Sequence, residues 1–201
     1  MSAGTAHGHD LHESTGVENR KLGMWFFLSS EFLFFGALIT NYLLFKGRLD
    51  QSDELYPFNF YDIPFTSVSS FVLLMSSLTM VLAHHALHEG DQERTRTWLL
   101  ATAGLGLVFL GGQYFEFTEF ALNGASLSAA PVWSAFFVLT GFHGAHVLIG
   151  VVMLLVLFGT SLRSPTGLSE HHGLNVELVG LYWHFVDIIW IVIFTIIYLI
   201  P

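Results

Sequence analysis

Five long apolar segments constrain this chain more than any other feature. Each covers about 20 residues or more, which is the length that an α-helix needs to cross the ~30 Å hydrocarbon core of a bilayer. Strand-like alternation is missing from them, and only helices or closed barrels satisfy the backbone in lipid. The sequence therefore predicts an all-α integral membrane bundle of five transmembrane helices, over residues 22–45, 65–87, 98–120, 131–159 and 174–200.

Composition agrees with a membrane protein and excludes several other classes. Charged residues make up 11% of the 201 residues, against about 25% in a typical soluble domain. The absence of cysteine excludes disulfides, thiolate nucleophiles and cysteine metal sites. A net charge of −9 without a basic patch argues against nucleic acid as a partner. Residues 1–21 are polar and lack the pattern of a cleaved signal peptide, so we expect a polar tail over 1–21 and a membrane domain over 22–201.

The positive charges predict how the bundle is oriented. With the N-terminus inside, five Lys and Arg residues fall on the inside and two on the outside. The inside set is Arg20, Lys21, Arg94, Arg96 and Arg163, and the outside set is Lys46 and Arg48. Because inside loops are enriched in Lys and Arg, we expect the N-terminus inside and the C-terminus outside.

Several polar side chains lie within the predicted helices. A charge at the bilayer centre costs at least ~2.5–3.5 kcal/mol, so such groups should face the bundle interior and find partners. At ~1.5 Å per residue, five of them fall in one central band, namely Glu31, His143, His146, His184 and Asp187. Two further carboxylates, Glu116 and Glu119, fall near the outer end of the third helix.

Three interpretations of the central band remain open. Pairs such as His143 and His146, three residues apart, could present two metal ligands on one helical face, as in carboxylate-bridged di-metal bundles. The Glu116 and Glu119 pair that such a site would require lies at another depth, however. Intramembrane carboxylates and histidines also form proton relays, although no acidic chain links the two levels here. The third interpretation, which we prefer, is a set of paired polar groups that hold the helices together.

Five ordered motifs resemble a known family along residues 22–200. They are "SEFLFFGAL" at 30–38, "LAHHALHEGD" at 82–91, "QYFEF" at 113–117, "FHGAHVLIG" at 142–150 and "YWHFVDIIWI" at 182–191. Their order and spacing are similar to those of cytochrome c oxidase subunit III. Long members of that family have two more helices at the N-terminus, so this chain resembles the five-helix bacterial form.

The resemblance implies a multi-pass subunit of the bacterial cell membrane that carries no catalytic residue of its own. It implies direct packing on subunit I of a proton-pumping heme–copper oxidase, contact with other oxidase subunits, and heme and copper held by those partners. It further implies that the chain stabilises subunit I and supports its proton uptake. Bound phospholipid is also implied, with Arg163, His171 and His172 as headgroup contacts.

The electron donor expected from the resemblance is cytochrome c. A subunit III of a quinol oxidase is the alternative within the family, because the donor binds elsewhere in the complex. From another class, a stand-alone membrane metalloenzyme would use the central histidine and carboxylate band.

Overall fold

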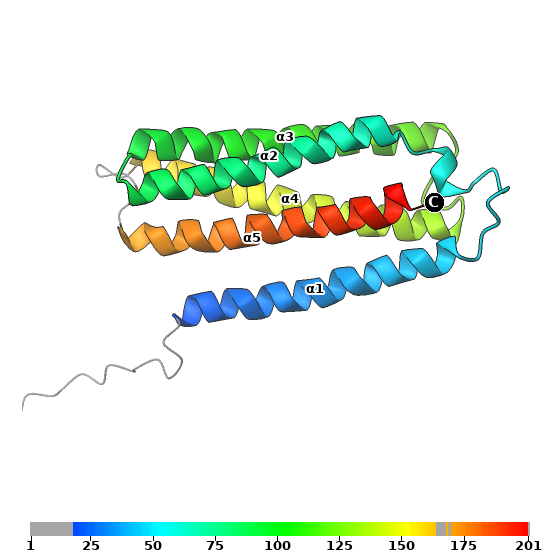
Figure 1. The fold of residues 1–201 in the computed structure, drawn as a ribbon, viewed down its shortest axis with the longest axis horizontal. Coiled ribbons are helices and arrows are strands. Elements are labelled where there is room, and N and C mark those ends of the chain that lie inside the picture. The colour runs from blue at the N-terminus through cyan, green and yellow to red at the C-terminus, as the bar shows by residue number, and fades with distance from the viewer. Residues whose placement is uncertain (1–17, 164–167, 169, 201) are drawn as a thin grey trace, which may run out of the picture.

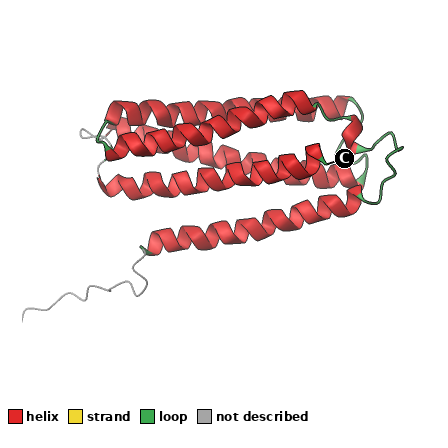
Figure 2. Ribbon diagram, viewed as in Figure 1, coloured by secondary structure: helices red, strands yellow, loops and turns green. Residues whose placement is uncertain are grey.

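A computed structural model describes residues 18–163, 168 and 170–200 of the chain. Five long helices make up almost all of it, each long and apolar enough to span a membrane, and no strand occurs among the described residues (Figure 2). The predicted five-helix membrane bundle is therefore confirmed. The helices are α1 (Asn19–Lys46), α2 (Ile63–His88), α3 (Gln92–Leu122), α4 (Pro131–Arg163) and α5 (Glu170–Phe194); a short 3₁₀ turn, η1 (Pro57–Asn59), precedes α2, and a π-helical turn, η2 (Thr195–Leu199), ends α5.

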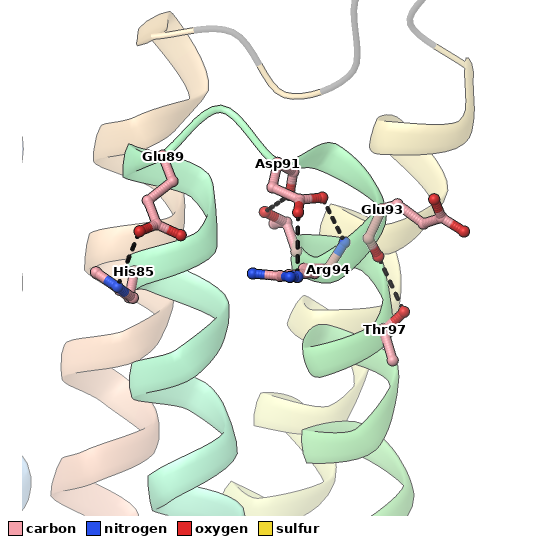
Figure 3. A network of polar contacts seen from close by, with 7 residues as sticks. His85, Glu89, Asp91, Glu93, Arg94 and Thr97 are labelled. Atoms are coloured by element: carbon pink, nitrogen blue, oxygen red, sulfur yellow. Dashed lines mark hydrogen bonds and ion pairs between the residues drawn. The ribbon is translucent and has the colours of Figure 1, made fainter.

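The tight turn between α2 and α3 shows how polar residues end these apolar helices (Figure 3). Gly90 has a φ of +74°, which a residue with a side chain rarely adopts, and it reverses the chain after α2. Asp91 caps α3, since its carboxylate accepts a hydrogen bond from the backbone N–H of Arg94 at 3.0 Å. The Arg94 guanidinium in turn lies 3.2 Å from the Asp91 carboxylate, while His85 and Glu89 form a second pair across the last turn of α2. These contacts stabilise the adjoining ends of α2 and α3, which pack closely against each other along their length.

The first helix lies at one edge of the bundle and packs against α4 and α5 (Figure 1). Its buried residues recur at a period close to 3.6 and so form a single stripe, Leu28, Phe35, Ile39, Tyr42 and Lys46. Large apolar side chains elsewhere on α1 remain exposed, among them Phe26 at 70% and Leu33 at 73%. Such a surface is unsuited to water and suited to lipid or to another membrane subunit.

Polar contacts fasten α1 to α5 at both ends. Near the start of α1, Lys21 forms an ion pair with Glu177, and Arg20 donates a hydrogen bond to Asn175. At the other end, the buried Lys46 ammonium donates to the backbone carbonyl of Ile200 at 2.6 Å. The two helices therefore run in the same direction, as the first and fifth of five crossings must.

The start of α1 and the end of the chain lie at opposite ends of the bundle (Figure 1). Five spans place the two termini on opposite sides of a membrane, but the side that each faces rests on the Lys and Arg count and stays a prediction. We expect reporter fusions to place the N-terminal end inside and the C-terminal end outside. A C-terminal reporter that is active inside the cell would overturn this orientation.

Candidate functional site

Glu31 and His146 form a close polar pair between α1 and α4. The Glu31 Oε2 atom lies 3.2 Å from His146 Nε2, and the two side chains are only 20% and 13% exposed. The other ring nitrogen, Nδ1, lies 2.7 Å from the carbonyl oxygen of Phe142. A carbonyl can only accept, so Nδ1 carries a proton and the contact between Nε2 and Glu31 needs one more.

That additional proton can reside on either partner. It gives an imidazolium beside a carboxylate, or a neutral imidazole that accepts from a carboxylic acid. Both forms are neutral overall, which is the condition under which a polar pair tolerates burial in a membrane. The backbone carbonyl of His146 also accepts a hydrogen bond from the Tyr182 hydroxyl at 3.0 Å. This bond joins α5 to α4 at the level of the Glu31–His146 pair.

His143 has an apolar setting although it lies one turn from His146. Its ring is fully buried and stacks on Trp190 at 4.9 Å between ring centroids, with edge contacts to Phe35 and Phe109. Within the described part of the chain, neither ring nitrogen has a hydrogen-bond partner. The imidazole therefore acts here as an aromatic packing element.

A row of serines on α2 binds three side chains of α5. The bonds are Trp183 Nε1 to Ser76 Oγ at 2.9 Å, Trp190 Nε1 to Ser70 Oγ at 2.8 Å, and Ser77 Oγ with His184 Nδ1 at 2.6 Å. Each serine lets the helices approach closely and satisfies a buried polar atom, which apolar packing cannot do. The face of α5 that packs on these serines also carries Asp187, which is 3% exposed.

The two carboxylates near the end of α3 differ in environment. Glu116 is buried, and its two oxygens accept hydrogen bonds from Thr66 at 2.7 Å and Tyr198 at 3.1 Å. Glu119, one turn further along α3, is exposed. The ring of Tyr61 packs against Tyr198 at 4.5 Å, and burial raises the pKa of the Tyr61 phenol well above its usual value. Glu116 thus joins α2, α3 and the last turn of the chain.

The predicted phospholipid contacts are only partly described. Arg163 ends α4 and is exposed. The side chains of His171 and His172 lie outside the described residues, so their position relative to Arg163 stays a prediction.

The central band therefore contains three settings. Glu31 pairs with His146, His143 sits among aromatic rings, and His184 and Asp187 face the serines of α2. Across residues 18–163, 168 and 170–200, no three or more His, Cys, Asp or Glu side chains converge as metal ligands would. The metal-site interpretation gains no support from this geometry, and the pairs agree with a role in holding helices together.

Several residues that build these settings are missing from the sequence prediction. They are the partners on neighbouring helices: Thr66, Ser70, Ser76, Ser77, Tyr182 and Tyr198. The signal for three of them is present in "SVSSFVLLMSSLT" at 67–79, where serines recur in an otherwise apolar segment. Hydroxyls at that spacing point to polar partners on an adjacent helix as well as to close packing.

Comparisons with known proteins agree with the fold. The family model for cytochrome c oxidase subunit III matches residues 1–200. The chain is 33% identical over 197 residues to a probable quinol oxidase subunit 3 of Staphylococcus saprophyticus, which covers 94% of this chain and 96% of that protein. A probable quinol oxidase subunit 3 of Staphylococcus aureus is also 33% identical, over 196 residues and the same shares.

The family and the five spanning helices together identify a multi-pass protein of the bacterial plasma membrane. Cytochrome c, the electron donor expected from the sequence motifs, is not confirmed, because the relatives carry the name of quinol oxidases. The match over nearly the whole length shows that the chain belongs to the subunit III family of heme–copper oxidases, the oxidoreductase complexes of aerobic respiration.

Proposed function

We propose that this chain is subunit III of a quinol-oxidising, proton-pumping heme–copper terminal oxidase. The observation that carries the choice of donor is the similarity to quinol oxidase subunit 3 proteins along 96% of their length. The chain itself would hold no redox centre, and heme and copper would reside in partner subunits. Its direct partner would be subunit I, which it stabilises and whose proton uptake it supports.

The surface of the bundle fits a subunit that is built into a larger membrane complex. Large apolar residues are exposed along all five helices, including Phe71, Tyr114, Leu122 and Ile188. Buried polar pairs between helices hold the interior together. A stable scaffold with an apolar exterior is what a supporting membrane subunit requires.

Purification of the native complex through a tag on this chain tests the proposal. We expect a heme-containing complex whose oxygen consumption is driven by a soluble quinol analogue and not by reduced cytochrome c. The reverse preference would restore cytochrome c as the donor. A monodisperse preparation without heme from native membranes would refute the assignment to an oxidase.

We further propose that Arg163 contacts a phospholipid headgroup. An exposed guanidinium at the end of a spanning helix lies where phosphates gather, and it can form charge-assisted hydrogen bonds with them. Native mass spectrometry should therefore show less phospholipid retained by Arg163→Ala than by the wild type. Arg94→Ala is a matched control, because Arg94 is occupied by Asp91 within the α2–α3 turn. Equal lipid retention in Arg163→Ala and wild type would leave Arg163 as an ordinary positive-inside residue.

A further inference from the structure

Asp187 is a buried carboxyl group that the helix packing leaves without a hydrogen bond. Its side chain lies on α5 in the middle of a spanning helix and is 3% exposed. Neither carboxyl oxygen has a hydrogen-bond partner, and no ion pair includes it, within the part of the chain that the structure describes. Buried polar groups in folded proteins almost always have partners, so this exception calls for an explanation.

A bare carboxylate is a poor description of such a site. An isolated charge in an apolar interior is among the most costly groups to bury, whereas a neutral carboxylic acid is far less costly. Glu31 avoids the problem by pairing with His146, and Glu116 by accepting two hydrogen bonds. Asp187 has neither solution, which favours the protonated acid.

Two polar side chains link Asp187 to the interior edge of a cavity. The Ser77 hydroxyl on α2 lies beside the Asp187 carboxyl, close enough to act on it but without a hydrogen bond of normal geometry. The Ser77 oxygen lies 2.6 Å from His184 Nδ1. His184 is one turn from Asp187 on α5, and it lines the cavity between α2 and α5. The series Asp187, Ser77, His184 thus leads from a buried carboxyl group to a side chain that lines the cavity.

The cavity lies at the end of the bundle that carries the α2–α3 turn. Its volume is about 370 Å³, which is large enough for many water molecules. The titratable groups that line it are His84, His85 and His88 from α2, and Glu177 and His184 from α5. His84 and His88 meet through their Nε2 atoms at 3.1 Å, and the buried Nδ1 of His84 has no partner among the described residues.

From this arrangement we propose that Asp187 is a buried proton-binding site, which exchanges its proton with the cavity through Ser77 and His184. To release it, the Asp187 carboxyl first turns to hydrogen-bond the neighbouring Ser77 hydroxyl. Asp187 then gives its proton to Ser77 Oγ while the Ser77 hydroxyl proton passes to His184 Nδ1. His184 then loses its Nε2 proton to water in the cavity and is left as the other neutral tautomer. The reverse steps reload the acid, so each transfer moves one proton and conserves charge.

The route is one-sided. Beyond Asp187, α5 continues through Trp190, which bonds Ser70 and stacks on His143. Among the described residues neither ring nitrogen of His143 has a hydrogen-bond partner, so no hydrogen-bonded chain leads on from Asp187 in that direction. Asp187 therefore ends a path that opens at one face of the bundle. The route does not depend on quinol or cytochrome c as the donor of the complex, because each of its groups belongs to this chain.

Infrared spectroscopy of the full chain in lipid nanodiscs can detect the acid directly. The chain has six aspartates, and those described besides Asp187 lie outside the helices, at loops and helix caps: Asp50, Asp53, Asp62 and Asp91. With carboxyl-labelled aspartate, we expect a protonated C=O band that shifts on labelling and disappears in Asp187→Asn. If no labelled band of a protonated acid is found in the wild type, or if it persists in Asp187→Asn, the proposal is wrong.

The route is tested by the rate at which this band shifts after transfer to D₂O. Ser77→Ala and His184→Phe should each slow the exchange about tenfold, the factor that ~1.4 kcal/mol of added barrier produces. Ser67→Ala and His85→Phe are matched controls, since the Ser67 hydroxyl donates to Ile63 within α2, and His85 is exposed and pairs with Glu89. The controls should exchange at the wild-type rate. Unchanged exchange in both Ser77→Ala and His184→Phe would overturn the route, and helical circular dichroism of each variant verifies that it is folded.

Discussion

Replacing Trp183 with alanine should destabilise the bundle strongly, by about 3–5 kcal/mol if the site behaves as other core tryptophans do. The indole is fully buried and lies in a notch between α3 and α4. A methyl group added at Gly106 or Gly150 would lie 2.6 or 2.7 Å from the indole, so both glycines are needed to admit it. Its Nε1 atom also donates to Ser76 on α2.

The loss would therefore have two parts. Alanine removes the packed ring from a notch whose glycine walls have no side chains to move inward, and it leaves the Ser76 hydroxyl without its donor. Trp183→Phe should fall between wild type and alanine, because it keeps an aromatic ring and loses the hydrogen bond. Trp25→Ala is a suitable control, since Trp25 is 52% exposed on α1.

Equilibrium unfolding of the purified chain in mixed detergent micelles measures these differences. We expect the midpoint to fall markedly for Trp183→Ala, less for Trp183→Phe and little for Trp25→Ala. Equal midpoints for Trp183→Ala and Trp25→Ala would show that the notch contributes nothing special to the packing of α5 on α3 and α4.

The number and place of the helices could be predicted from sequence because they follow from one property. A segment of apolar residues that is long enough to span a bilayer leaves few alternatives to a helix. The helix ends are harder to predict, since they depend on polar residues. α3 begins at Gln92, six residues before the apolar segment 98–120, because Asp91 caps it, and α1 begins at Asn19, before the apolar segment 22–45.

The pairing of the buried polar residues could not be predicted, because depth along a helix says nothing of rotation about it. His143, His146 and His184 all lie at a depth that could reach Glu31, and the structure gives that position to His146 alone. Glu116 and Glu119 are three residues apart, yet one is buried and the other exposed. A rotation of roughly 60° separates such positions on a helix of 3.6 residues per turn, and tertiary packing decides which of them faces inward.

Glu31→Ala is expected to weaken the attachment of α1 without stopping the chemistry of the complex. The substitution leaves His146 Nε2 facing a space that the carboxyl group filled, and a buried polar atom that loses its partner costs about 1–3 kcal/mol. Glu31→Gln should be milder, because the amide can donate to a neutral His146 and so replace the one proton that the pair requires. His146→Ala should resemble Glu31→Ala, since either change breaks the same pair.

For the proposed oxidase, we expect the consequence to be faster inactivation during turnover. If the chain is a supporting subunit, none of these changes touches a heme or copper ligand, so the initial rate of oxygen consumption by the purified complex should match the wild type. Without this pair α1 binds α4 less tightly. We therefore expect the complex to lose this subunit, or to inactivate after fewer turnovers. Oxygen consumption is followed from the first turnover until activity is lost. The number of turnovers before inactivation should be highest for wild type, lower for Glu31→Gln and lowest for Glu31→Ala. Immediate and complete loss of activity in a Glu31→Ala complex that retains all subunits and hemes would show instead that Glu31 takes part in the reaction, and that its pairing with His146 serves more than the packing of helices.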